Sequence, residues 1–312
     1  MDLPGRPGFD SVVFANGHLV IAHQGANTVD IFDPTRRRLV AQVNNVQDPR
    51  GIVADEMAGR VYVASAAGKG IVVIDSKTWQ VLRTIELKQS PEGIILAGQN
   101  GARALAVTNP NHRSISWVPV DATGEATDEA STFELGGRPQ ELAWDAQRKV
   151  LFVTVEDLAE VVTVNPFTTQ GDAIMQRTKL AASQPTGLVF EPNSRQLFVA
   201  VRYAVLQLDA ETGIEISRVP AAAGANTLWL ESQGNTLFAT AGSGTVQTIN
   251  IGAGKMTSQD EFVSQVRGNG IAYDPVNKLM FLPGGREGKS KLVILKQFGT
   301  VIQPGVVSAQ KR

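Results

Sequence analysis

A short apolar run with a small or polar first residue recurs seven times along this chain. The steps between successive runs are 40, 42, 48, 46, 40 and 43 residues. Self-similarity at about 40–45 residues is typical of β-propellers, in which each repeat supplies one blade of four strands. The repeat therefore predicts a seven-bladed ring. The seven runs begin at Ser11, Gly51, Gly93, Glu141, Gly187, Thr227 and Gly270.

The copy from Arg60 to Leu87 shows the pattern within one repeat most clearly. Its second and third strands, Val61–Ala64 and Ile71–Ile74, are short and rich in β-branched residues, which favours strands over helices. They are apolar on both faces, as expected when neighbouring sheets cover each side. The last strand, Val81–Leu87, partly alternates, as expected at the outer rim. The fold class predicted is all-β, a seven-bladed β-propeller with four antiparallel strands per blade.

The organisation predicted is a single domain over residues 1–312, with blades that start near residues 9, 49, 91, 139, 185, 225 and 268. Glycine begins the inner strand in four of the seven copies, and near the axis a missing Cβ allows close backbone approach. Two copies contain insertions, at 119–131 and 165–176. The last copy lacks a clear fourth strand before a tail at 303–312, so the ring closes either with residues 300–302 or with the N-terminal segment.

The repeats resemble those of the YVTN-type seven-bladed propellers, a bacterial family that includes surface-layer and periplasmic proteins. The resemblance spans nearly the whole chain, although the tetrapeptide YVTN itself is absent. It implies a scaffold, and it says little about function. Glycine-histidine and tryptophan-aspartate pairs do not occur in the WD40 pattern, and the single Trp144-Asp145 lies on an inner strand, which disfavours that class. The resemblance rests on Pro49–Asp55, Arg60–Ser65, Val73–Thr78, Pro185–Leu188, Gln196–Ala200, Asp209–Gly213 and Gly270–Pro275.

Composition excludes several classes of function. The formal net charge of −1 gives no general attraction to nucleic acid, and we predict no nucleic-acid partner. The chain has no cysteine, no phosphate-binding glycine loop and no apolar window of about 18 residues, so we predict no cofactor and no transmembrane segment. The first residues lack the signal-peptide pattern. We expect a monomer in the periplasm or outside the cell after removal of a signal, with a cytoplasmic protein as the alternative.

A ligand site is expected at the mouth of the central channel. The loops that enter the inner strands and those that join second to third strands share that face. Arg50, Arg138 and Arg267 precede three inner strands, and arginine forks suit carboxylate or phosphate. The alternative is that they pair with acids such as Asp48 and Glu92. The predicted ligand-binding residues are His23, Arg50, Glu92, Arg138, Gln140, Arg202, Asn226, Arg267, Asn269 and Arg286.

Catalysis has weaker support in the sequence. His112, Arg113 and Glu156 occupy neighbouring mouth loops and could carry out general acid–base chemistry. The three histidines show no metal-ligand spacing, so we predict no metal site. The function predicted is a non-enzymatic propeller that binds a protein, a peptide or a small anionic ligand. The alternative is a lactonase- or lyase-like enzyme that uses arginine, histidine and glutamate at the same mouth.

Overall fold

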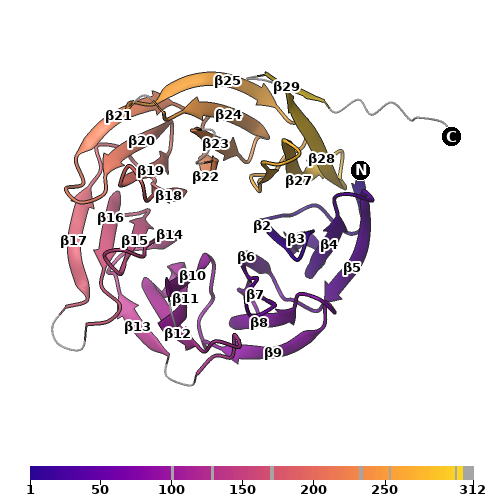
Figure 1. Ribbon diagram of the computed structural model, residues 1–312, viewed down its shortest axis with the longest axis horizontal. Coiled ribbons are helices and arrows are strands. Elements are labelled where there is room, and N and C mark those ends of the chain that lie inside the picture. Colours follow the sequence, from indigo (N-terminus) through magenta and orange to yellow (C-terminus); the bar gives the residue numbers. More distant parts are fainter. Residues whose placement is uncertain are drawn as a thin grey trace.

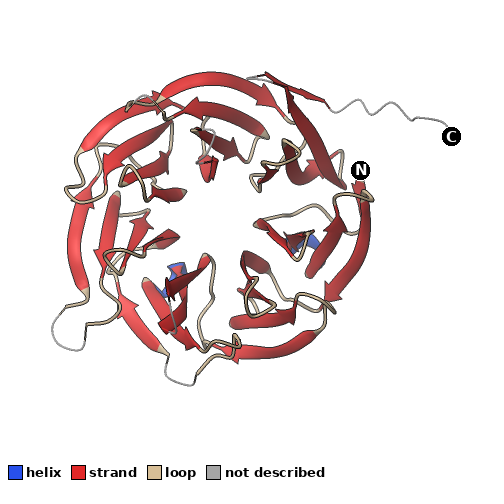
Figure 2. Ribbon diagram, viewed as in Figure 1, coloured by secondary structure: helices blue, strands red, loops and turns tan. Residues whose placement is uncertain are grey.

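The structure is a computed structural model that describes residues 1–99, 102–127, 130–168, 172–231, 235–252, 254–298 and 301–304. Its strands form seven sheets arranged in a ring around an open axis (Figure 1), which confirms the seven-bladed β-propeller. Figure 2 shows that the described regular structure is almost entirely strand. Helix is confined there to two 3₁₀ turns, η1 (Gln24–Ala26) and η2 (Pro110–His112).

Six blades contain four strands each, in sequence order from the axis outward, and each strand pairs antiparallel with the next. The first three blades are β2 (Val12–Ala15), β3 (His18–His23), β4 (Thr28–Asp33) and β5 (Arg38–Asn44); β6 (Pro49–Asp55), β7 (Arg60–Ser65), β8 (Gly70–Asp75) and β9 (Val81–Glu86); β10 (Ile94–Gln99), β11 (Ala102–Asn109), β12 (Ser114–Val120) and β13 (Ser131–Glu134). The next three are β14 (Pro139–Asp145), β15 (Val150–Val155), β16 (Glu160–Val164) and β17 (Ile174–Lys179); β18 (Leu188–Glu191), β19 (Gln196–Val201), β20 (Ala204–Asp209) and β21 (Glu215–Pro220); β22 (Ala225–Glu231), β23 (Thr236–Ala241), β24 (Thr245–Asn250) and β25 (Thr257–Val263).

The core lies between the blades. The same position of the second strand carries a large, fully buried ring in several copies, such as Tyr62, Phe152 and Phe198. One apolar cluster joins β3 and β4 to β7 and β8, so each sheet is covered by its neighbour. This packing explains why second and third strands are apolar on both faces. In β9 the exposure alternates along the strand, as expected for an outer strand.

Close backbone contacts fix the width of the channel. At Gly51, Gly93, Gly187 and Gly270, an added Cβ would lie 2.4–2.8 Å from a carbonyl oxygen of the next blade. Real Cβ atoms are not found so close to backbone oxygen, so the backbone geometry in these four blades leaves room only for glycine. The prediction of close approach near the axis is confirmed. The four carbonyls belong to Glu92, Gln140, Asn226 and Asp10, respectively.

Alanine at Gly270 is expected to lower the free energy of unfolding by about 1–3 kcal/mol, because the two backbones must move apart. The new Cβ would lie 2.4 Å from the Asp10 oxygen across the junction of the last and first blades. Gly242→Ala is the matched control, because nothing lies within 4 Å of its Cβ position. Urea denaturation of both variants measures the difference. If Gly270→Ala and Gly242→Ala had equal free energies of unfolding, the two backbones at this junction could move apart without loss of stability.

The last blade uses both ends of the chain. Its inner three strands are β26 (Ala272–Asp274), β27 (Leu279–Arg286) and β28 (Lys289–Phe298). Strand β1 (Asp2–Leu3) pairs with the start of β28, and β29 (Val301–Pro304) pairs with its end. The two closures that the sequence left open are therefore used together.

A buried histidine holds the N-terminal segment in place. His23 Nδ1 lies 2.8 Å from Asp30 Oδ2, and His23 Nε2 lies 2.7 Å from the carbonyl oxygen of Arg6. Ser290 of the last blade donates a hydrogen bond to the carbonyl of Gly5 and lies 3.2 Å from the same Nε2. Phe9 stacks on the imidazole at 4.2 Å. We call this set the closure latch.

Candidate functional site

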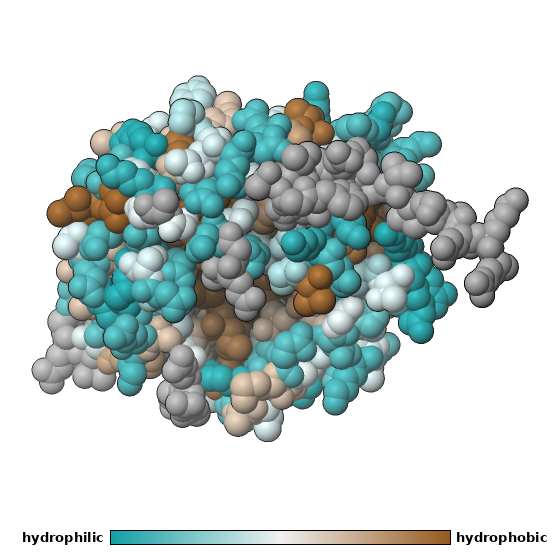
Figure 3. All heavy atoms as spheres, turned by 45° about the horizontal axis from the view of Figure 1, so that its top comes forward, coloured by the Kyte–Doolittle hydropathy of each residue, from teal (hydrophilic) through white to brown (hydrophobic). Residues whose placement is uncertain are grey.

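Seven polar residues, one from each blade, surround the central channel. Each directly precedes the residue that begins an inner apolar run. Together they line a cavity of about 540 Å³ to which all seven blades contribute, a size typical of small-molecule sites. In the space-filling view, apolar atoms are visible inside a central hollow with a largely hydrophilic border (Figure 3). This channel ring consists of Asp10, Arg50, Glu92, Gln140, Thr186, Asn226 and Asn269.

Arg50 is neutralised by neighbouring acids. Its guanidinium nitrogens lie 3.1 Å from Asp48 Oδ2, 3.6 Å from Asp10 Oδ2 and 3.9 Å from Glu92 Oε1. Burial raises the pKa of Asp10 to about 6, although the charge of Arg50 opposes the shift. Carboxylates therefore already balance the charge of this arginine. This arrangement corresponds to the alternative given by the sequence, in which the arginine pairs with neighbouring acids and does not bind an anion.

Glu141 is a lining residue that sequence reasoning missed. It takes the position at which four other blades have glycine. Burial raises the pKa of its carboxyl to about 7, and repulsion from Asp10 and Glu92 acts in the same direction. The N–H of Leu142 donates to Oε1 at 3.3 Å. The sequence did contain a sign of this role, because Glu141 is the one acidic residue at a repeat position that carries glycine, serine or threonine in the other copies.

The channel is consequently acidic on one side and neutral on the other. Blades one to four contribute Asp10, Glu92 and Glu141 against the single cation Arg50. Blades five to seven contribute only uncharged members of the channel ring, Thr186, Asn226 and Asn269, together with Trp229. Among the described residues, no group of three or more His, Cys, Asp or Glu side chains is placed to hold a metal ion.

Half of the predicted ligand-binding residues line the cavity, and half do not. Arg50, Glu92, Gln140, Asn226 and Asn269 line it. The five that do not are His23, Arg138, Arg202, Arg267 and Arg286. His23 has no exposed surface because it belongs to the closure latch, so it is not available to a ligand at the mouth.

The three arginines that precede inner strands do not gather at the channel, because only Arg50 occupies the position next to the inner apolar run. Arg50 belongs to the channel ring, whereas Arg138 and Arg267 lie two residues before its members Gln140 and Asn269. Arg138 Nη1 lies 3.9 Å from Glu156, and the backbone of Arg267 bridges to Gly285. Arg138 and Arg267 are exposed and do not line the channel.

Arg202 and Arg286 contact exposed residues of nearby loops. The guanidinium of Arg202 lies 5.2 Å from the centre of the Tyr203 ring. Arg286 donates to Gln265 at 3.0 Å and lies 3.7 Å from Glu287. Neither of these side chains reaches the lining of the channel.

No contact described in the structure joins the three predicted catalytic residues to one another. His112 is exposed in η2. Arg113 lies 3.4 Å from Asp157 and donates to the carbonyl of Gly136 at 3.0 Å. Glu156 instead accepts a hydrogen bond from Gln140 at 2.9 Å, and so it orients a member of the channel ring.

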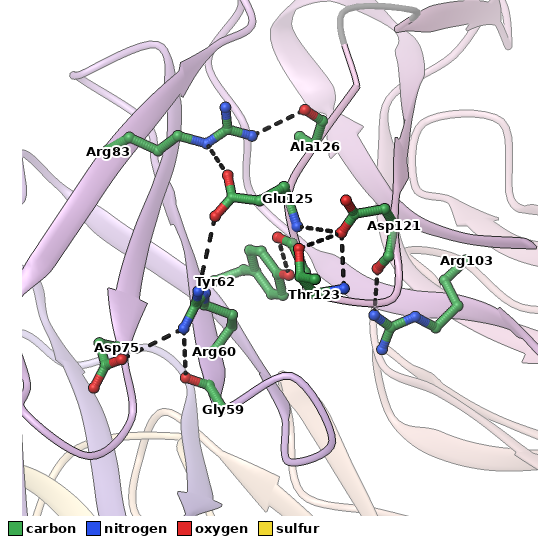
Figure 4. A network of polar contacts seen from close by, with 11 residues as sticks. Gly59, Arg60, Tyr62, Asp75, Arg83, Arg103, Asp121, Thr123, Glu125 and Ala126 are labelled. Carbon is green, nitrogen blue, oxygen red and sulfur yellow. Dashed lines mark hydrogen bonds and ion pairs between the residues drawn. The ribbon is translucent and has the colours of Figure 1, made fainter. Parts of the chain in front are cut away.

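The insertion at 119–131 packs against the preceding blade (Figure 4). Tyr62 donates to the carbonyl of Gly124 at 2.7 Å, and Arg83 donates to that of Ala126 at 3.0 Å. Glu125 lies between Arg60 and Arg83, at 3.8 and 3.3 Å. The described part of this hairpin is therefore a clasp between two blades. Residues 128 and 129 of this insertion, and 169–171 of the second, lie outside the described residues.

Comparison with known proteins supports the fold. No family model matches the chain, and no curated protein matches it. A virginiamycin B lyase from Staphylococcus aureus is similar in structure, with a TM-score of 0.71 and 16% identity over 91% of this chain and 94% of the other. A protein of unknown function from Desulfotomaculum acetoxidans has a TM-score of 0.76 and 13% identity over 90% and 92%. The Cps50 (Swd1) propeller domain from Myceliophteria thermophila has 0.72 and 13% over 93% and 97%.

These identities show a shared fold and nothing finer. The three proteins differ in what their names describe, so the likeness assigns no activity to this chain. In the part of the chain that the structure describes, no helix is both long and apolar enough to span a membrane.

Proposed function

We propose that this chain is a non-enzymatic binding propeller that takes a small ligand, or the protruding end of a partner segment, into the mouth of its channel. The observation that carries the proposal is the channel ring. Its seven positions are equivalent in the repeat, yet only two of them, Asn226 and Asn269, carry the same type of residue. A purely structural ring has no need of such variety, whereas orientation of a ligand requires it.

An enzyme is the second candidate, and one observation favours it. A carboxyl with a pKa of about 7, such as that of Glu141, suits proton transfer near neutral pH. Lyases that cleave virginiamycin B share the fold, and one of their structures is described as inactive after a histidine was replaced by alanine. The titratable side chains that line this channel are instead Asp10, Arg50, Glu92 and Glu141. We therefore favour binding over lyase chemistry.

We also infer that the chain is a YVTN-type propeller that acts in the periplasm or outside the cell. The support is the repeat pattern, such as Arg60–Ser65 followed by Val73–Thr78. The regularity of the seven sheets is consistent with it.

Trp229 offers a direct test of binding, because it lines the channel and Trp79 does not. We expect an ultrafiltered small-molecule extract to shift the indole N–H resonance of Trp229 in ¹⁵N NMR and to leave that of Trp79 unchanged. Asn226→Phe, which fills the channel, should abolish the shift. Asn44→Phe on the exposed face of β5 is the size-matched control.

The outcomes separate the candidates. An unmoved Trp229 across all fractions would contradict the binding function. Turnover of cyclic esters that disappears in Glu141→Gln would favour the enzyme.

A further inference from the structure

We propose that the ligand of the channel is a small organic cation, an amine or a guanidinium, either free or at the end of a partner's side chain. This inference rests on the proposed binding function and names its chemical class. It reverses the charge that the arginines in the sequence suggested. Four observations carry it: the balance of charge, the coupling of the acids, an unpaired acceptor and an aromatic wall.

The charge balance inside the cavity is negative. Three carboxyl groups line it, from Asp10, Glu92 and Glu141, and Arg50 is the one cationic side chain in the lining. That arginine already contacts Asp10 and Glu92, as well as Asp48 outside the lining. An anion would have to displace these contacts and approach the remaining acids. A cation would instead neutralise carboxylates that the protein leaves uncompensated.

The acids repel one another across the channel. Asp10 and Glu92 both disfavour ionisation of Glu141, and Glu92 disfavours ionisation of Asp10. Like charges in a recessed site interact strongly, because solvent screens them poorly. A positive group placed among these carboxyls would relieve that repulsion, which gives the protein a reason to bind one.

The neutral side of the channel contains a buried acceptor without a donor. Asn226 Oδ1 is buried and has no hydrogen-bond partner among the described residues. A buried acceptor without a partner is destabilising, so a ligand donor would stabilise it once the amide turns its oxygen into the cavity. Ammonium and guanidinium groups carry only donors. Trp229, half-buried in the same wall, adds an aromatic surface of the kind that attracts organic cations.

An organic cation fits better than a metal ion. The described carboxyls do not gather into a group able to ligate a metal. The cavity of about 540 Å³ is far larger than a single ion requires, and it falls in the range of small-molecule sites. Its lining mixes carboxylates, amides and an aromatic ring, whereas hard cations prefer a shell of oxygen ligands alone.

Three five-carbon probes test the inference, because they share a chain length and carry positive, neutral or negative end groups: pentane-1,5-diamine, pentane-1,5-diol and glutarate. Binding is followed by the Trp229 indole resonance and by calorimetry at low ionic strength. We expect the diamine to bind at least about tenfold more tightly than either of the others. Its affinity should increase between about pH 6 and pH 8, because Glu141 ionises with a pKa of about 7 while the amines stay charged.

Variants identify the residues responsible. Glu141→Gln and Glu92→Gln should each weaken diamine binding by about fivefold or more and flatten its salt dependence. Glu287→Gln removes the same charge from an exposed loop outside the lining and should have no effect. Circular dichroism at each pH verifies that every variant is folded.

Each outcome decides a different question. Binding of glutarate or of the diol as tight as that of the diamine would overturn the cation and leave the binding function standing. Diamine binding that both channel variants leave unchanged would also overturn the inference. If none of the probes moves Trp229 while the extract does, the cationic class is wrong. If neither probes nor extract move it, the binding function fails as well.

Discussion

Deleting residues 2–8, so that Met1 directly precedes Phe9, is expected to lower the free energy of unfolding by about 5 kcal/mol. The deletion removes β1 and the buried side chain of Leu3, which contributes about 2 kcal/mol. It also removes the carbonyls of Gly5, Arg6 and Gly8 that accept hydrogen bonds from Ser290, from His23 and from the Gly25 N–H. Each such bond contributes about 1 kcal/mol, and the buried His23 and Ser290 would each lose a partner.

Denaturant unfolding followed by tryptophan fluorescence measures this loss. Asp2→Ala is the control within the same strand, because it removes only the exposed ion pair with Lys291, worth less than about 1 kcal/mol. A truncated protein within about 1 kcal/mol of the parent would show that β29 alone closes the ring.

His23→Ala should be the most damaging single substitution among the polar residues considered, with a loss of about 3–5 kcal/mol. Both His23 and Asp30 are fully buried. The change leaves the Asp30 carboxylate with the hydrogen bonds from Thr28 and Gln42 but without the imidazole. It also opens a cavity beneath Phe9, whose ring stacks on the histidine.

Thermal unfolding of His112→Ala provides the control, because that histidine is exposed and its removal should change stability by less than about 0.5 kcal/mol. Asp30→Asn in the same background should reduce the cost of His23→Ala, since the group left unpaired is then uncharged. Equal losses with and without Asp30→Asn would mean that the cost comes from the cavity and not from the ion pair.

Repetition explains why the fold was predictable. A residue such as Tyr62 or Phe198 faces the neighbouring blade in its own copy, and the same packing requirement returns about 40 residues later. A periodic signal of this kind survives substitutions in any one copy. The glycine positions follow the same logic, because Gly51 and Gly187 contact the next blade in the same way.

The site was predictable only in part, because it depends on exact register and on contacts distant in sequence. Arg138 and Arg267 are displaced by two residues from the position of Arg50, a shift that places a side chain outside the lining. His23 appeared to be a mouth residue, since nothing local indicates that the first nine residues cover it. In the sequence Glu141 only begins an inner strand, whereas its place in the channel depends on Asp10 and Glu92, which are distant along the chain.

The backbone contacts made by the four glycines have a consequence for diversification of the protein. Main-chain atoms set the diameter of the channel. The chemistry of its wall is set by side chains, those of the channel ring together with Glu141 and Trp229, that do not make these backbone contacts. Substitutions in the channel wall, made one blade at a time, should therefore change its charge and shape with little effect on the free energy of unfolding. The side chains of the channel ring can therefore be exchanged while the backbone of the propeller stays the same.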